Sequence, residues 1–355
     1  MMHTRAKGHK LHYMQPARGA AVCAASLSCK RRRVCGTIRR RAFLLLMSIK
    51  GGRVKNHSDE LIFHSQGLRR SAANLEIASE NSPSRNSPRV SQRFDLEGNM
   101  GTNSPAEILQ IWIGNGTKKA NLKIAKMFLL GIFAGIYIGL GSHVFLIATA
   151  GAETGFEQMM GKLVGAALFP AGLMMVILCG AELFTGNCLL TLALADRKIS
   201  LKQLLTNWIV VYLGNFAGAL FLSSLLAGSG LYGGSLGERA VAVASSKAAM
   251  GFGEGLIRGV LCNILVVLAC WMQAGAKDLT GKILAIWFPI ALFVFAGFEH
   301  SVANMTYIPL GMMLGASVSM GQMLIGNLLP VTIGNIIGGG LIVPAAYYYI
   351  YKPQA

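Results

Sequence analysis

Two short stretches decide the fold: Gly180-Ala-Glu-Leu-Phe-Thr-Gly-Asn187 and Gly297-Phe-Glu-His-Ser-Val-Ala-Asn304. Each lies inside apolar sequence, and each carries glycine, glutamate and asparagine at the same offsets, 117 residues apart. A carboxylate inside an apolar segment is costly, so it indicates a functional or paired position. Interrupted helices in corresponding positions of two halves are typical of a transport site at the middle of a membrane.

A second repeat supports the division into halves. Gly214-Asn-Phe-Ala-Gly218 matches Gly334-Asn-Ile-Ile-Gly338, 120 residues apart. Small residues let two membrane helices approach closely, so we expect these glycines to serve helix packing and give them no transport role. The glycines concerned are Gly214, Gly218, Gly334, Gly338, Gly339 and Gly340.

The apolar runs predict the number of membrane spans. A helix needs about 20 apolar residues to cross the hydrocarbon layer. Runs without Lys, Arg, Asp or Glu cover residues 127–152, 163–181, 203–237, 259–276, 283–298 and 301–351. The second and fifth runs end at a glutamate, and the last is long enough for a half-span and a full span. We therefore predict an all-α integral membrane protein with six transmembrane helices in two inverted three-helix repeats, the second and fifth helices being broken.

The formal net charge of +18 is unevenly distributed. Residues 1–100 hold 19 Lys/Arg and 6 Asp/Glu, so most of the excess lies outside the apolar region and does not indicate a nucleic-acid groove. With six spans and the N-terminus inside, ten basic residues of the apolar region lie on the inner side and four on the outer side. This distribution satisfies the positive-inside rule.

The N-terminal segment has the composition of a targeting sequence. Its first 58 residues contain 14 Lys/Arg and no Asp or Glu, which is typical of an organelle transit peptide. The following Ser79–Pro105 stretch is rich in Ser, Asn and Pro and predicts a disordered linker. The alternative is a solvated basic tail. We divide the chain into a basic targeting or disordered segment, 1–105, and a membrane domain, 106–355.

The breaks also hold the residues with useful chemistry. His300 is the one histidine in a repeat break, and an imidazole can donate a hydrogen bond or a proton to an anion near neutral pH. Thr185 can donate a hydroxyl hydrogen bond or cap a half-helix. For Glu182 and Glu299 we expect a supporting role: they accept hydrogen bonds from backbone N–H groups freed at the breaks. The same carboxylates are expected to accept bonds from Asn187 and Asn304.

Other function classes lack their signatures. None of the seven cysteines forms a CxxC pair, so we expect no metal site and no cofactor. An enzyme is not indicated, because GxSxG and HExxH are absent. A neutral-solute channel of the aquaporin type would need paired Asn-Pro-Ala hinges, which are also absent. A purely structural or receptor role remains as an alternative that anion flux would exclude.

Several strings together resemble the signatures of the formate/nitrite transporter family, over roughly residues 105–352. These are the first break, Trp287-Phe-Pro-Ile290, Gly297-Phe-Glu-His-Ser-Val-Ala-Asn-Met305 and Asn327-Leu-Leu-Pro-Val-Thr-Ile-Gly-Asn335. The resemblance implies an aquaporin-like protomer with its own pore, and assembly as a homopentamer around a lipid-filled axis.

The resemblance also implies roles for individual residues. His300 matches the central pore histidine, Thr185 the hinge threonine, Lys247 a vestibule lysine that attracts anions, and Asn263 a polar pore position. The matching hydrophobic constriction residues are Phe169, Leu173 and Phe293, with Phe184 and Val266 as weaker matches. The implied mechanism is attraction of the anion, followed by its neutralisation or hydrogen bonding at His300. Proton-coupled transport and passive conduction are both compatible with it.

The family handles formate, nitrite, lactate and hydrosulfide through similar sites, and no residue of the pore decides among them. The leader favours an organelle, and the chain in this respect resembles the chloroplast-envelope nitrite transporters of the family. We therefore expect nitrite import across the inner envelope membrane of a plastid. The alternative is a formate, lactate or hydrosulfide channel or proton-coupled transporter in another membrane. The expected partners are the anion, H⁺ in the coupled case, membrane lipid and other copies of the chain, but no nucleic acid.

Overall fold

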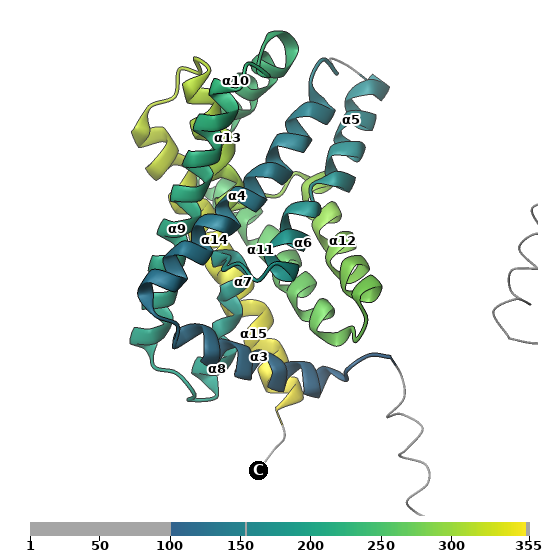
Figure 1. The fold of residues 1–355 in the computed structure, drawn as a ribbon, viewed down its shortest axis with the longest axis vertical. Helices are drawn as coiled ribbons and strands as arrows, with labels where there is room; N and C mark the ends of the chain where they lie inside the picture. The colour runs from purple at the N-terminus through teal and green to yellow at the C-terminus, as the bar shows by residue number, and fades with distance from the viewer. Residues whose placement is uncertain (1–100, 153–154, 353–355) are drawn as a thin grey trace, which may run out of the picture. The chain divides into compact units, whose positions relative to one another are not determined.

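The computed structural model describes residues 101–152 and 155–352, and within these ranges the regular secondary structure is helical apart from one isolated bridge between Thr102 and Ala276. The predicted targeting segment lies outside the described residues except for its last few positions. Figure 1 shows a bundle of helices that run mostly along one direction.

The first half contains three apolar spans and one break. Its elements are α3 (Pro105–Ala120), α4 (Ile124–Thr149), α5 (Gly155–Leu168), α6 (Ala171–Leu178), α7 (Phe184–Asn187), η2 (Cys188–Leu190), α8 (Thr191–Ala195) and α9 (Leu201–Gly228).

The second half repeats this order. Its elements are α10 (Gly234–Ala248), α11 (Phe252–Gly275), α12 (Leu279–Ala296), α13 (Ser301–Met313), η3 (Gln322–Leu328), α14 (Leu329–Ile336), η4 (Ile337–Ile342) and α15 (Val343–Tyr351).

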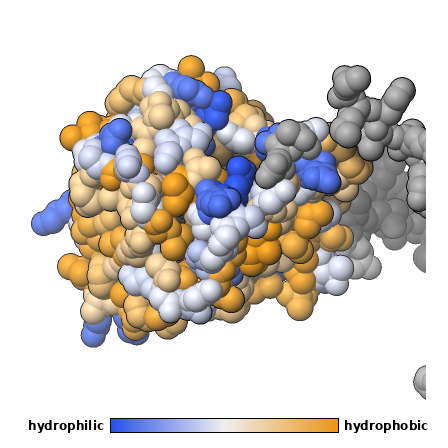
Figure 2. Space-filling view, turned by 90° about the horizontal axis from the view of Figure 1, so that it is seen from above, coloured by the Kyte–Doolittle hydropathy of each residue, from blue (hydrophilic) through white to orange (hydrophobic). Residues whose placement is uncertain are grey.

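Six helices of the described chain are long and apolar enough to cross a membrane, which confirms the predicted number of spans. They cover Ile124–Thr149, Gly155–Leu178, Leu201–Gly228, Phe252–Gly275, Leu279–Ala296 and Gln322–Tyr351. Their outward faces carry many exposed leucines, isoleucines and phenylalanines. Figure 2 accordingly shows apolar residues around much of the outline of the molecule, while polar residues gather over the face that is viewed.

Both predicted breaks are present. In each, the apolar helix stops just before or at a glycine with a left-handed backbone, Gly180 at φ 80° and Gly297 at φ 79°. A side chain at such a φ is disfavoured, which explains why both stretches begin with glycine. After each break a short apolar segment follows, Phe184–Ala195 in one half and α13 in the other. Both segments are too short to cross the membrane alone.

Two helices were not predicted from the sequence. α3 and α10 each precede the first span of a half, and they lie at opposite ends of the bundle (Figure 1). A capping box of Ser104 and Glu107 starts α3, since each side chain accepts a bond from the other residue's backbone N–H. Their opposite placement is what an inverted repeat requires.

The repeated glycines pack as predicted. An added Cβ at Gly214 or Gly218 would meet backbone carbonyl oxygens of α4, and one at Gly334 or Gly338 would meet those of α11. The long helices of each half therefore touch backbone to backbone at these points, which brings the breaks close to the helices that hold them.

Candidate functional site: two cavities and the contact between them

The first break is held by a buried ion pair. Lys119 Nζ lies 2.7 Å from Glu182 Oε1 and donates to Asn187 Oδ1 at 3.1 Å. Asn187 in turn donates to Glu182 Oε2 at 2.7 Å and to Asn207 Oδ1 at 2.9 Å. The Glu182 side chain is only 6% exposed, so the lysine compensates a carboxylate that water barely reaches.

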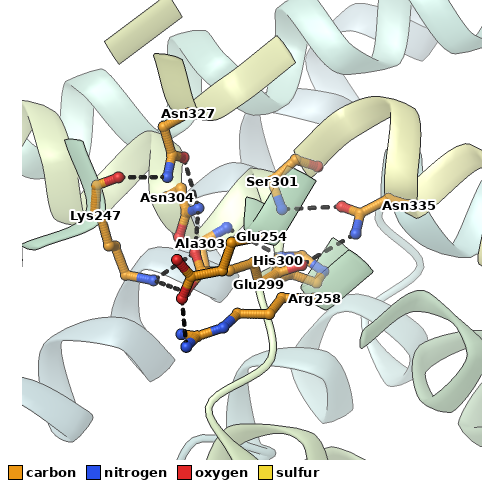
Figure 3. A network of polar contacts seen from close by, with 10 residues as sticks. All are labelled: Lys247, Glu254, Arg258, Glu299, His300, Ser301, Ala303, Asn304, Asn327 and Asn335. Carbon is orange, nitrogen blue, oxygen red and sulfur yellow. Dashed lines mark hydrogen bonds and ion pairs between the residues drawn. The ribbon is translucent and has the colours of Figure 1, made fainter. Parts of the chain in front are cut away.

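The second break repeats this cluster (Figure 3). Lys247 Nζ lies 2.8 Å from each Glu299 carboxylate oxygen. Asn304 donates to Glu299 Oε2 and to Asn327 Oδ1, both at 2.7 Å, and Asn327 donates to the Lys247 carbonyl at 2.9 Å. Each half of the chain thus builds the same lysine, glutamate and two-asparagine network at its own break.

The bonds expected between the asparagines and the glutamates are present, but the expected bonds from backbone N–H groups to the glutamates are not the ones formed. Asn215 Oδ1 instead accepts from Phe184 N at 2.9 Å, and Asn335 Oδ1 accepts from Ser301 N at 3.0 Å. The physical reason is the ion pair, because a carboxylate removed from water needs a cation beside it. Lys119 supplies that cation to Glu182, and Lys247 supplies it to Glu299.

Both asparagines also close the other side of the break. Asn215 donates to the Gly131 and Glu182 carbonyls at 2.8 and 2.9 Å, and Asn335 donates to the Gly259 and Glu299 carbonyls at 2.8 and 3.1 Å. An amide can accept and donate at once, which a carboxylate cannot. One side chain therefore satisfies backbone groups on both sides of each interruption.

His300 joins the two halves. It caps α13, since its Nδ1 accepts from Ala303 N at 3.0 Å, and its Nε2 lies 2.9 Å from Thr185 Oγ1. Because a backbone N–H can only donate, Nδ1 carries the lone pair and the proton of the neutral ring is on Nε2. Nε2–H therefore donates to Thr185, and the threonine hydroxyl hydrogen is left available for another acceptor.

Aromatic rings cover one side of this histidine. The Phe293 ring stacks on His300 with centroids 5.8 Å apart, and Phe169 meets Phe293 edge-on at 5.7 Å. Both phenylalanines are almost completely buried. The imidazole thus lies beside an apolar contact formed by two rings from different halves of the chain.

Two cavities approach the Thr185–His300 contact. One, of about 460 Å³, is lined by residues that include Lys119, Leu173, Glu182, Gly186 and Lys282, and we call it the Lys119 cavity. The other, of about 80 Å³, is lined by residues that include Phe169, Lys247, Phe293, Glu299 and His300, and we call it the His300 cavity.

Thr185 is buried between the cavities. Its chain neighbour Gly186 lines the Lys119 cavity, and its hydrogen-bond partner His300 lines the other. Its carbonyl accepts from Asn263 Nδ2 at 3.2 Å. The partition between the cavities is therefore made of Thr185, His300 and the groups that hold them.

Comparison with known proteins agrees with this architecture. A family model described as formate/nitrite transporter matches residues 106–349. The chain belongs to the formate/nitrite transporter family. The match covers both breaks, both ion-pair clusters and the two cavities. The family resemblance expected from the sequence is thereby confirmed.

Individual relatives extend the family match. The uncharacterized transporter YrhG of Bacillus subtilis is 43% identical over 259 residues, covering 72% of this chain and 96% of YrhG. The formate channel FocA of Escherichia coli is 37% identical over 268 residues, covering 70% of this chain and 94% of FocA.

Two solved structures of the family share the fold. A pentameric formate channel with formate bound is 38% identical, with a TM-score of 0.59, and covers 64% of this chain and 97% of the channel. An ion channel of the formate/nitrite transporter family is 31% identical, with a TM-score of 0.64, and covers 68% of this chain and 98% of that channel. These neighbours confirm the predicted fold class.

The structure brings together most, but not all, of the residues that the family resemblance suggests. His300, Thr185 and Asn263 meet at the partition, and Phe169, Leu173 and Phe293 line one cavity or the other. Phe184 and Val266 are buried but line neither cavity. Phe184 instead packs edge-on against Tyr212 at 4.9 Å and Trp208 at 6.1 Å. Their part in a constriction stays a prediction.

Sequence reasoning missed several members of the clusters in this family member. Lys119, Asn207 and Asn327 were given no site role, and Asn215 and Asn335 were noticed only as repeat markers. A signal was present in each case. Lys119 and Lys247 are 128 residues apart and Asn207 and Asn327 are 120 apart, close to the spacing of the breaks.

Proposed function

We propose that the chain conducts small monovalent weak-acid anions across a membrane, formate being the best supported, and that the route passes between the Lys119 and His300 cavities. The observation that carries this proposal is the Thr185–His300 contact at the partition. Relatives support the substrate class, since two of them are named formate channels or hold formate.

The partition offers a hydrogen bond to an anion. Because Nδ1 of His300 accepts from the Ala303 N–H, the imidazole Nε2–H donates to Thr185 and leaves the threonine hydroxyl hydrogen free to donate elsewhere. A carboxylate oxygen that reaches Thr185 finds this donor in a site without bulk water. Hydrogen bonds to charged acceptors are stronger than neutral ones, so the contact offsets part of the lost hydration.

Proton transfer from His300 has a geometric cost. A neutral imidazole must first gain a proton before it can give one to an anion. In the described arrangement that proton would go to Nδ1 and face the Ala303 N–H, donor against donor. The geometry therefore favours a hydrogen-bonded anion over a fully protonated acid as the species that passes Thr185.

Apolar residues on either side supply selectivity. Leu173 lines the Lys119 cavity, and Phe169 and Phe293 line the His300 cavity. Removing hydration costs more for a divalent anion than for a monovalent one, and these three apolar side chains offer a dehydrated cation no oxygen ligand. Passage is therefore limited to small anions of low charge.

The assembly proposed with this function is a homopentamer with one pore in each chain. The support is the relative described as a pentameric formate channel, together with the wide apolar outer surface. Membrane lipid covers the part of that surface that other copies do not.

The deciding experiment is flux of formate and nitrite, in competition, into liposomes that hold the purified chain. We expect liposomes with the protein to take up formate and protein-free liposomes to take up none. Nitrite should inhibit this formate uptake by competition. Uptake of neither anion, by protein that elutes as a folded oligomer, would contradict the proposal. Nitrite uptake that formate barely inhibits would replace formate with nitrite as the substrate.

Nitrite import into a plastid is a second candidate, and one observation favours it: the first 58 residues are rich in Arg and free of acid. Fusion of residues 1–105 to a fluorescent protein tests the location. Signal at the plastid is the expected result, and cytosolic or plasma-membrane signal would remove the reason for this candidate.

A further inference from the structure

The lysines that line the two cavities at the breaks are both paired with carboxylates. Each cavity contains a lysine, and each lysine is neutralised by a glutamate of the adjacent break, Lys119 by Glu182 and Lys247 by Glu299. A close ion pair has little net field beyond its own length, so neither lysine by itself gives its cavity a positive potential. If anions are to gather at these entrances, another charge must attract them.

Lys282 provides such a charge at the Lys119 cavity. It lies in the first turn of α12 and is among the residues that line this cavity, together with Gly180 of the first break. Within the described ranges, no carboxylate lies within ion-pair distance of its ammonium group. Its ammonium group therefore lines the Lys119 cavity without an ion-pair partner among the described residues.

Lys162 occupies the equivalent place at the other entrance. It lies in α5, 120 residues before Lys282, which is the offset of the second repeat. A Cβ on Gly297 would be 3.9 Å from its Nζ, and Gly297 lines the His300 cavity. The same Nζ lies 5.6 Å from the centre of the Phe295 ring and has no ion-pair partner in the part of the chain that the structure describes.

The arrangement is reciprocal. Lys162 belongs to the first half and lies at the break of the second, whereas Lys282 belongs to the second half and lies at the break of the first. Lys162 lies beside the left-handed Gly297, and Lys282 lines the same cavity as the left-handed Gly180. Surface lysines at membrane interfaces are common, but here one lysine without an ion-pair partner in the described chain lines the Lys119 cavity, and another lies beside a glycine that lines the His300 cavity.

We propose that Lys162 and Lys282 are the charges that gather the anion at the two entrances. Lys119 and Lys247 hold the breaks, although the family resemblance led us to expect that Lys247 attracts the anion. The inference rests on the proposed transport function and assigns positioning residues within it. Lys162 and Lys282 raise the local concentration of the anion before it meets Thr185 and His300. They do not take part in the passage through the partition.

The test is equilibrium exchange of isotope-labelled formate in liposomes, with equal formate inside and outside so that protein of either orientation contributes. The double variant Lys162→Gln and Lys282→Gln is expected to raise the half-saturating formate concentration about threefold for each charge removed and to leave the maximal rate unchanged. The dependence of exchange on ionic strength should flatten, because the screened charges are gone. Arginine at both positions should preserve the wild-type values.

The matched control is Lys277→Gln, which removes an exposed charge close to α12 that lines neither cavity. A structural role for Lys162 or Lys282 would lower the maximal rate and not shift the salt dependence. Half-saturation and salt dependence equal to those of the control would overturn the inference while leaving transport intact. Absence of exchange by the wild-type protein would overturn the proposed function and this inference with it.

Discussion

Replacement of Lys247 with methionine is expected to lower the free energy of unfolding by about 3–5 kcal/mol, since it leaves one partner of a buried ion pair alone. The Lys247 side chain is 16% exposed and that of Glu299 is 5% exposed, so water cannot take over the role of the ammonium group. Asn304 would remain as a donor to Glu299, but a single neutral amide cannot compensate a full charge. Thermal unfolding of the purified protein in detergent measures the effect.

The matched control removes both charges. The double variant Lys247→Met and Glu299→Gln keeps the shape of the cluster and a side-chain oxygen for Asn304, so most of the lost stability should return. Recovery in the double variant would show that the unpaired carboxylate caused the loss. Equal instability of the single and double variants would mean that Lys247 stabilises the fold through packing, including its contact 5.3 Å above the Tyr307 ring.

Replacement of His300 with alanine is expected to reduce formate flux at least about tenfold, in line with the cost of leaving a buried donor unsatisfied. The change removes the cap of Ala303 N and the donor to Thr185 together. Thr185→Val is the companion variant, because it keeps the side-chain shape and removes only the hydroxyl. If the hydroxyl is the group that meets the anion, both variants should lose flux to a similar degree.

A third variant separates hydrogen bonding from proton transfer. His300→Gln supplies an amide that can accept and donate but cannot be protonated near neutral pH. Substantial flux in this variant would agree with passage of a hydrogen-bonded anion. Flux as low as in His300→Ala, in protein that is equally stable, would instead require a proton on the ring and contradict the reading of the Nδ1 geometry. Uptake into liposomes at fixed protein content is the measurement.

The parts of the structure that could be predicted are those with a strong local signal. Glu182 and Glu299 stand out because a carboxylate in apolar sequence has few explanations, and their glycine and asparagine neighbours fix the repeat. The six spans follow from length and composition. His300 was singled out because it is the one histidine in a break, and an imidazole is the side chain that can gain or lose a proton near neutral pH.

What could not be predicted depends on contacts between distant segments. The pairing of Lys119 with Glu182 joins positions 63 residues apart, and nothing around Lys119 distinguishes it from the lysines beside it. α3 and α10 were missed because they carry charges and lie mostly outside the uncharged runs. The two roles of Asn215 appear only when α9 is packed against the first break.

The two halves of the chain differ at the residues that form the partition. At the offset of the breaks, His300 corresponds to Leu183 and Thr185 to Val302, and at the offset of the ion-pair lysines Asn263 corresponds to Gly135. All three polar members of these pairs meet at the partition, where they bond to one another across the halves. The duplicated residues build the frame, and the unmatched ones form the chemistry.

Both cavities and the partition between them are lined by a single chain. In an assembly of several copies, a copy whose pore is blocked would therefore remove only its own conductance. Total flux through mixed assemblies should fall in direct proportion to the share of blocked copies, without the steeper loss seen when subunits build one passage together. A cell carrying one defective and one intact version of such a gene would keep the conductance of every intact copy.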